Sequence, residues 1–280
     1  MRFLQIILRG IGQVMFQNNV YSGLLFLAGI FYNSWLLGLA ALSGTLISTV
    51  TAQLLKFQKE DIENGLYGFN GTLSGIAVLV FFDLNLISLV TLLVASVLST
   101  IVIHFLKRLL PPFTAPFVLV TWLVLGFFLF LFKIPLMPTS SAPEHTLNIM
   151  TAAANSFGQV MLQQNVITGL FFIAAISIND RLMAAYAIYA ALLAGLAGVV
   201  LAEPDSWING GLAGYNAILC AIALTGKSRQ DFLWITLAIL IATVLNIALA
   251  KTGLITLTAP FVLTTWMILF FKEGKYRTQK

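Results

Sequence analysis

Long apolar stretches, separated by short polar segments, run the length of this 280-residue chain. The polar breaks fall near residues 33, 56–64, 83–85, 107–112, 133–148, 179–181, 203–206, 227–231 and 251–253. Apolar stretches of about 20 residues suit helices that cross a bilayer, whereas the strands of a membrane barrel alternate over about 10 residues. The pattern predicts an all-α membrane protein with five crossings on each side of the central polar segment, ten in all.

The two sides of the central segment are copies of one another. The sequence TAPFVLVTW at 114–122 returns as TAPFVLTTW at 258–266, identical at eight of nine positions. Two further blocks repeat with an offset of 146 residues: GQVMFQNNVYSG at 12–23 with GQVMLQQNVITG at 158–169, and GLYGFNG at 65–71 with GLAGYNA at 211–217. This offset is far longer than the 20 to 50 residues or so of a solenoid repeat. We expect two half-proteins, residues 1–132 and 155–280, joined by a linker at 133–154.

Composition and charge support a membrane location. Hydrophobic residues make up 59% of the chain, charged residues only 9%, and the mean hydropathy is +0.96. With the N-terminus inside, thirteen of the fifteen lysines and arginines lie on the inner side, and only Lys133 and Lys251 lie outside. This split predicts a multi-pass protein of the inner (cytoplasmic) membrane with both termini cytoplasmic. It also explains the pI near 9.4 by topology and anionic membrane lipid, without a nucleic-acid partner.

An odd number of crossings in each half makes the second half enter the membrane from the opposite face. Such inverted-topology repeats, often with broken or half-membrane helices, place a substrate site near the midplane where the halves meet. We therefore expect a central pore between the two repeats.

The ionisable residues fall near the predicted interfaces, and no charge is expected at the bilayer centre. Such a charge usually marks ion coupling or a proton relay, so the pattern favours a neutral solute that moves down its gradient. An intramembrane enzyme that uses His104 or Asp83 needs a titratable partner, which the sequence does not offer. It shows no catalytic nucleophile–base pair, cofactor motif or metal-ligand spacing, and the single cysteine, Cys220, is expected to be a packing residue.

Uncharged polar residues recur in the duplicated blocks, in the pairs Gln13 and Gln159, Gln17 and Gln163, Asn19 and Asn165, Asn70 and Asn216, and Thr114 and Thr258. Taken singly, such residues usually join membrane helices by hydrogen bonds. Their recurrence beside glycine and proline indicates a pathway. Pro116 and Pro260 should also break their helices and leave carbonyl oxygens free for a solute rich in N–H donors.

Two repeat positions combine an aromatic ring with a second large side chain. Phe69 and Tyr215 occupy one of them, and Phe16 and Leu162 occupy the other. A single aromatic residue is usually a core residue. Paired across two halves, flat rings also suit a narrow slot that admits a planar molecule and rejects a hydrated ion.

At these blocks the chain resembles the urea transporter family. The resemblance rests on QVMFQNN with Gly23, on GLYGFNGTL at 65–73, and on LPPFTAPF at 110–117, which fits an L-P-x-x-T-x-P-F signature. The second half carries weaker copies. The family likeness implies a homotrimer with one pore in each protomer, through which urea passes in single file between aromatic rings and along a ladder of backbone carbonyls.

The resemblance also implies roles for individual residues. Gln13 and Gln159 would bind urea at the two ends of the pore, while Thr114 and Thr258 would line its middle. Phe16, Phe69 and Tyr215 would form the slot walls. Tyr215 stands where the family usually has phenylalanine, and Leu162 replaces an aromatic partner of Phe16, so one slot is expected to be looser or more polar. The alternative is a channel for another small neutral solute, such as a short amide, ammonia or water.

Overall fold

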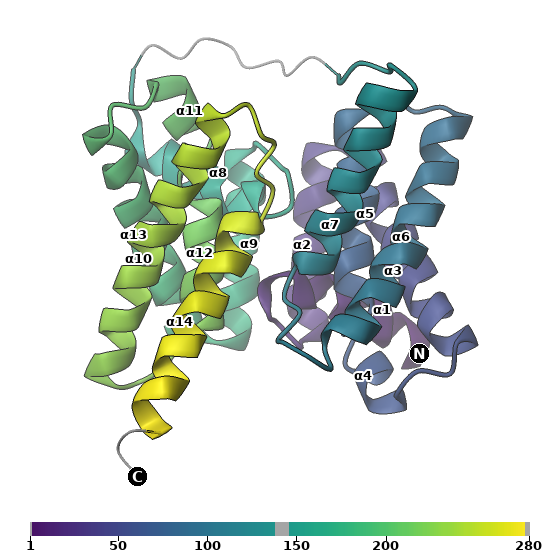
Figure 1. Cartoon of the computed structure of the whole chain (residues 1–280), viewed down its shortest axis with the longest axis horizontal. Coiled ribbons are helices and arrows are strands. Elements are labelled where there is room, and N and C mark those ends of the chain that lie inside the picture. The colour runs from purple at the N-terminus through teal and green to yellow at the C-terminus, as the bar shows by residue number, and fades with distance from the viewer. Residues whose placement is uncertain (1, 138–145, 278–280) are drawn as a thin grey trace.

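Helices make up both halves of the chain, which confirms the all-α prediction (Figure 1). The computed structural model describes residues 2–137 and 146–277, and these contain no strand. The first half comprises α1 (Arg2–Gly12), the 3-10 turn η1 (Gln13–Met15), α2 (Val20–Asn33), α3 (Trp35–Leu54), α4 (Lys59–Glu63), α5 (Gly68–Phe81), α6 (Leu86–Leu106), α7 (Ala115–Gly126) and the π-helical turn η2 (Phe127–Leu131). The second half comprises α8 (Ile149–Gln159), α9 (Val166–Asn179), α10 (Arg181–Val200), α11 (Asp205–Asn209), α12 (Tyr215–Ala223), α13 (Arg229–Lys251) and α14 (Ala259–Arg277).

Only some of these helices are long enough to cross a membrane alone. Four are long and apolar enough, namely α3, α6, α10 and α13, with 20 to 23 residues each. The bent pair formed by α1 with η1 and by α2 supplies a fifth, with an angle of 76° between its arms. Other apolar helices, including α5 and α9, have 10–17 residues. At 1.5 Å per residue a 14-residue helix spans only about 21 Å of a core about 30 Å thick. The shorter helices agree with the expectation of broken or half-membrane helices, and the number of ten crossings stays a prediction.

The central linker is shorter than expected on its C-terminal side. Helix α8 begins at Ile149, within the expected linker 133–154, and Asn148 caps it by accepting hydrogen bonds from the backbone of Met150 and Thr151. The middle of that linker, 138–145, lies outside the described residues. Because α8 is the counterpart of α1, both halves open with a short helix.

Left-handed backbone conformations recur at the repeat offsets. Four pairs share a positive φ: Phe16 and Leu162 (61° and 60°), Lys56 and Ala202 (54° and 56°), Gly65 and Gly211 (75° and 80°), and Phe113 and Leu257 (44° and 47°). Gly65 and Gly211 also pack against the first helix of their half, where an added Cβ would lie 2.4 Å from the backbone nitrogen of Gly10 or 2.3 Å from the carbonyl carbon of Asn155. The duplication therefore extends from sequence to backbone geometry.

The halves are joined by reciprocal hydrogen bonds. Asn33 Nδ2 donates to Gln163 Oε1, and Asn179 Nδ2 donates to Gln17 Oε1, both at 2.8 Å. Asn33 and Asn179 are repeat counterparts, as are Gln17 and Gln163. In both contacts a residue of one half bonds to the residue of the other half that corresponds to its counterpart's partner. Such reciprocal contacts are typical of two surfaces related by a two-fold axis. Gln17 and Gln163 are fully buried, whereas Asn33 and Asn179 are exposed, and the four amides join the halves as polar side chains join membrane helices.

Two more pairs of bonds follow the same rule. Ser22 Oγ donates to the Ala175 carbonyl at 2.7 Å, and Thr168 Oγ1 donates to the Gly29 carbonyl at 2.8 Å. The indole nitrogens of Trp122 and Trp266 donate to the carbonyls of Ile255 and Pro111, each at 2.8 Å. The first pair joins α2 to α9, and the second joins each Pro-Phe helix to the chain that precedes its counterpart.

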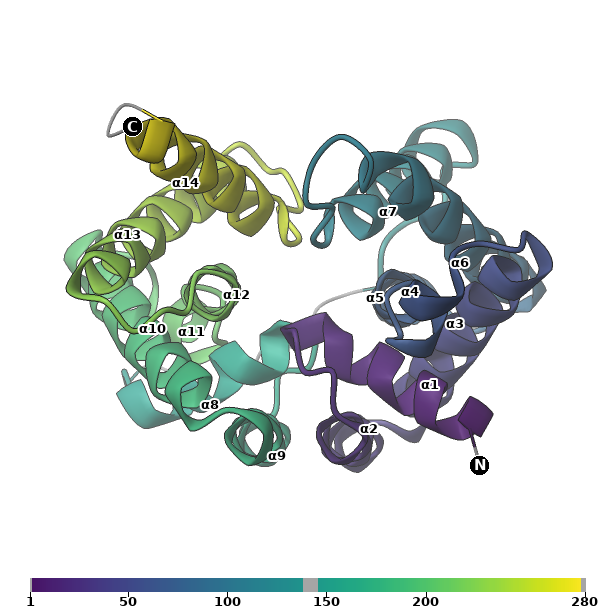
Figure 2. The same ribbon diagram turned by 90° about the horizontal axis from the view of Figure 1, so that it is seen from below.

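Helices α2 and α9 lie side by side at the junction (Figure 2), where the rings of the counterparts Phe26 and Phe172 meet edge to face with centroids 5.0 Å apart. Helices α1 and α8 point toward the middle of the molecule from opposite sides (Figure 2). The counterpart turns α4 and α11 lie at opposite ends of the helices, and the start of α1 and the last turn of α14 lie at the α4 end (Figure 1).

Candidate functional site

Gln13 and Gln159 lie where the first helix of each half breaks. Each donates Nε2–H to a backbone carbonyl of its own half, Gln13 to Asn64 and Gln159 to Gly210, both at 3.0 Å. Both side chains are partly exposed, and their Oε1 atoms accept no hydrogen bond within the described chain. The backbone tie fixes each amide and leaves one acceptor oxygen free for a solute.

The backbone after each glutamine turns sharply and leaves carbonyl oxygens open. The left-handed residues Phe16 and Leu162 reverse the chain, and the amide nitrogens of Gln17 and Gln163 return to the carbonyls of Gly12 and Gly158 at 3.0 Å. Across residues 2–137 and 146–277, no donor reaches four carbonyls of this segment, those of Val14, Phe16, Val160 and Leu162. We call these open carbonyls, together with the Gln Oε1 that precedes them in the chain, the acceptor row of each half.

The expectation of free carbonyls at Pro116 and Pro260 was wrong. Asn70 Nδ2 donates to the Phe113 carbonyl at 3.3 Å, and its Oδ1 accepts from the backbone of Phe117 at 3.0 Å. Asn216 makes the same two bonds in the second half, to the carbonyl of Leu257 at 3.2 Å and from the backbone of Phe261 at 3.0 Å. The prolines lie in the first turn of α7 and α14, where a missing backbone donor costs nothing. These two asparagines clamp the helix starts.

Thr114 and Thr258 meet at the boundary between the halves. Their Oγ1 atoms are 2.7 Å apart and hydrogen-bonded, and the residues are 1% and 2% exposed. Counterparts can touch in this way only close to the two-fold axis, so the pair marks the centre of the junction. The structure brings these two predicted residues together and leaves no water-sized gap between them.

Phe16 has aromatic neighbours that sequence reasoning missed. Its ring lies 5.9 Å from that of Phe113 and 6.1 Å from that of Phe261, and these two rings are 5.3 Å apart. The counterparts of this cluster are Leu162, Leu257 and Phe117, so only one of the two ends carries three rings. The signal was present in the sequence, because Phe113 and Phe261 belong to the Pro-Phe blocks.

Phe69 and Tyr215 lie in the first turn of α5 and α12 and are 5% and 7% exposed. In the described chain, the ring of Phe69 makes no contact with that of Phe16. The Tyr215 hydroxyl is 2.8 Å from the Leu257 carbonyl and 2.9 Å from Thr256 Oγ1. The hydroxyl is thus hydrogen-bonded to residues of the same half, and it does not add a free polar group to a slot.

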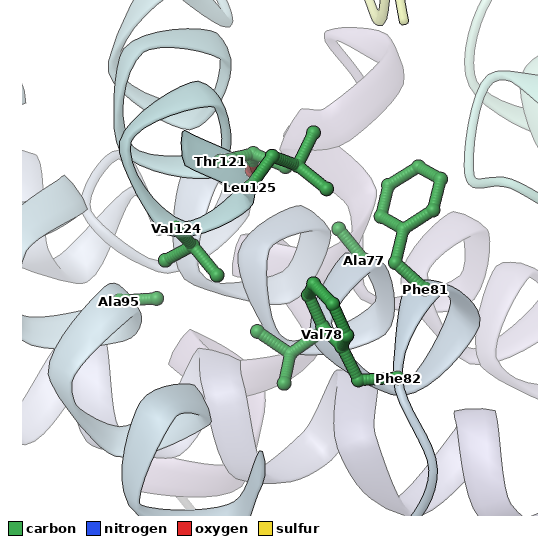
Figure 3. Close-up of a pocket in the computed structure, with 8 residues that line it drawn as sticks. All are labelled: Ala77, Val78, Phe81, Phe82, Ala95, Thr121, Val124 and Leu125. Atoms are coloured by element: carbon green, nitrogen blue, oxygen red, sulfur yellow. The ribbon is translucent and has the colours of Figure 1, made fainter. Parts of the chain in front are cut away.

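The described chain also contains a narrow crevice, too tight to admit a water molecule, inside the first half between α5, α6 and α7 (Figure 3). Its lining consists of Ala77, Val78, Phe81, Phe82, Ala95, Thr121, Val124 and Leu125. Seven of these eight side chains are apolar, so the crevice lacks the acceptors that a polar solute requires. The paired glutamines, acceptor rows and central threonines remain the candidate site.

Comparison with known proteins agrees with the sequence resemblance. Residues 4–273 match the profile of the urea transporter family. Urea transporter 1 of Rattus norvegicus is 36% identical over 247 residues, which cover 81% of this chain and 64% of the rat protein. Urea transporter 1 of Ovis aries is 31% identical over an alignment of 299 residues that covers 96% of this chain and 77% of the sheep protein. The chain thus spans less than two thirds of the length of the rat relative.

The contact between the central threonines predicts a non-additive stability cycle. Thr114→Val or Thr258→Val alone leaves one buried hydroxyl without its partner, which should lower the free energy of unfolding by about 1–3 kcal/mol. The double variant removes both hydroxyls at constant shape and should be close to neutral. Unfolding in detergent measures the cycle, with Thr91→Val, a substitution at a partly exposed position, as a control. If the loss of unfolding free energy in the double variant equals the sum of the losses in the two single variants, the two hydroxyls do not stabilise each other by a hydrogen bond.

Proposed function

The chain belongs to the urea transporter family, and on this premise we propose that it conducts urea passively across the cytoplasmic membrane. The observation that carries the proposal is the pair of acceptor rows, Gln13 Oε1 with its open carbonyls and Gln159 Oε1 with its own, together with the hydrogen-bonded threonine pair at the junction. Urea offers four N–H donors and one carbonyl acceptor, which is the complement of such rows.

The energetics favour this solute. Removing water from urea without replacement costs several kcal/mol, since each unmade polar contact costs on the order of 1–3 kcal/mol. A row of equivalent acceptors replaces that water at successive positions, so urea can both bind and leave. At the centre, the hydroxyls of Thr114 and Thr258 exchange their bond to each other for hydrogen bonds to the N–H groups and the carbonyl of urea. The rings of Phe16, Phe69 and Tyr215, with Leu162, restrict the path to a flat molecule.

A passive mechanism fits the placement of charge. The ion pairs of the described chain join Lys107 to Asp61, Lys251 to Glu203, Lys272 to Asp231 and Lys59 to Glu63. Each includes a residue at a helix end or in a connecting segment, and none includes Gln13, Gln159, Thr114 or Thr258. Ion-coupled transport needs an ionisable group on the path that changes its state with the ion, and these pairs offer none.

Uptake of urea into liposomes that contain the purified protein tests the proposal. We expect saturable flux that is independent of sodium, of membrane potential and of an imposed proton gradient. Accumulation of urea against its own gradient would exclude a passive path. Competition by formamide or ammonia that abolishes urea flux at equal concentration would favour the alternative, a channel for small neutral solutes in general.

We also propose that the two halves, residues 1–132 and the second half from the start of α8 at Ile149 onward, are inverted repeats with both termini cytoplasmic. Support comes from the opposite ends occupied by α4 and α11 and from the shared end of the two termini (Figure 1). Single cysteines at the exposed positions Lys59 and Asp83, in a Cys220→Ser background that copies Ser74 of the other half, report the topology. An impermeant reagent should label position 83 in intact cells and spare position 59. The reverse pattern would disprove the orientation.

Assembly as a homotrimer, with one pore in each protomer, is part of the proposal and rests on the family resemblance. Native mass spectrometry of the protein in detergent measures it directly, and a stable monomer that still conducts urea would remove the trimer from the mechanism.

The two pairs of glutamines should respond differently to mutation. Gln13→Ala or Gln159→Ala removes an acceptor at one end of the path and should lower urea flux per folded molecule about three- to tenfold, the equivalent of one hydrogen bond at the barrier. The matched control is Gln17→Leu, whose fully buried amide bridges Met15 and Asn179. This variant should lower the melting temperature and leave flux per folded molecule unchanged. If Gln13→Ala behaves like the control, Gln13 is structural.

A further inference from the structure

Helix α1 carries a polar stripe along one face. Gln5, Arg9 and Gln13 are spaced by four residues and therefore lie on the same side of the helix. The residues between them, including Ile6, Ile7 and Ile11, are buried in the core. The stripe leads from the inner end of α1 to the break at Gln13, where the acceptor row begins. Arg9 lies about 6 Å before Gln13 along the helix axis, at 1.5 Å per residue.

Helix α8 carries the same stripe without the charge. Thr151, Asn155 and Gln159 are the counterparts of Gln5, Arg9 and Gln13 at an offset of 146 residues. The backbone contacts are also equivalent. Arg9 Nη1 donates to the Glu63 carbonyl at 3.1 Å, and Asn155 Nδ2 donates to the Asn209 carbonyl at 2.7 Å. Glu63 and Asn209 are themselves counterparts, so the chain shows that a neutral amide can make this tie.

Arg9 forms no direct ion pair within the described chain. Among residues 2–137 and 146–277, no carboxylate lies within ion-pair distance of its guanidinium. The basic residue at the end of α6, Lys107, is paired with Asp61. Arg9 Nε is buried without a partner, whereas the side chain as a whole is partly exposed. The inner end of the stripe therefore carries a guanidinium that makes no direct ion pair in the described chain.

The acceptor rows by themselves cannot reject a planar cation. Guanidinium has the flat shape of urea, is weakly hydrated and stacks on aromatic rings, and carbonyl oxygens attract it. The C-terminal ends of α1 and α8 add partial negative charge near the open carbonyls. The slot and the acceptor rows accept urea and guanidinium alike. A fixed positive charge on the route distinguishes them, because it repels only the cation.

We propose that Arg9 is the charge barrier that excludes cations, and guanidinium above all, from the urea path. The inference rests on the proposed function, because it assumes that the stripe on α1 is the inner approach to that path. The role of Arg9 is electrostatic, and its bond to Glu63 only positions the charge.

The test is a comparison of urea and guanidinium uptake in liposomes for the wild type, Arg9→Asn and Arg9→Lys. Arg9→Asn installs the residue that the second half uses at the equivalent position, and we expect it to fold. It should raise guanidinium flux at least tenfold and keep urea flux within about twofold. Arg9→Lys retains the charge and should exclude guanidinium as the wild type does. Arg9→Gln is a second neutral variant, in case Arg9→Asn expresses poorly.

The outcomes separate the two proposals. Wild-type protein that conducts no urea refutes the proposed function. Normal urea flux, with guanidinium still excluded in both neutral variants, overturns the role of Arg9. The wild type supplies an independent measurement, since raising ionic strength from 0.01 M to 1 M shortens the screening length from about 30 Å to about 3 Å. Guanidinium leakage should then rise with salt while urea flux stays constant, and leakage that ignores salt contradicts the barrier.

Discussion

Lipid offers no hydrogen bonds, so every backbone polar group within the membrane must find a partner in the protein or line a wet path. This constraint sorts the two kinds of helix break in the chain. At the Pro-Phe blocks, side chains of Asn70 and Asn216 occupy the backbone groups that the turn exposes. After Gln13 and Gln159, the carbonyls of residues such as Val14 and Val160 stay open. At the first kind of break the exposed backbone groups are hydrogen-bonded within the protein, and at the second kind the free carbonyls supply the acceptors of the proposed path.

Duplication explains how such open backbone is held in place. Each half alone would expose the amide of Gln17 or Gln163 at its surface, and the partner half covers it with Asn179 or Asn33. Because the contacts are reciprocal, one set of residues stabilises the junction twice. The threonine pair at the centre follows from the same symmetry, since only counterparts near the axis can bond to each other.

The halves are not identical where it matters for a solute. Phe16 has two aromatic neighbours, whereas its counterpart Leu162 belongs to a set with a single ring. Arg9 carries a charge where the second half has Asn155. A passive path brings the solute to the same concentration on both sides of the membrane at equilibrium, but the free-energy barriers at its two ends need not be equal. The two ends can therefore divide the tasks of recognising a flat solute and rejecting a cation.

The sequence by itself determined the all-α membrane class, the duplication and the positions worth attention, because hydrophobic runs and repeated blocks depend only on local residue order. It did not determine which polar groups face a path. Asn70, Gln17 and Gln13 look alike as repeated amides in apolar surroundings, and only the tertiary structure showed that the first two are fully engaged while Gln13 keeps a free oxygen. It also moved the open carbonyls from the prolines to the turns after Gln13 and Gln159, and it revealed the rings around Phe16. These outcomes depend on partners far away in the chain, and residue order alone does not specify which groups folding brings within bonding distance.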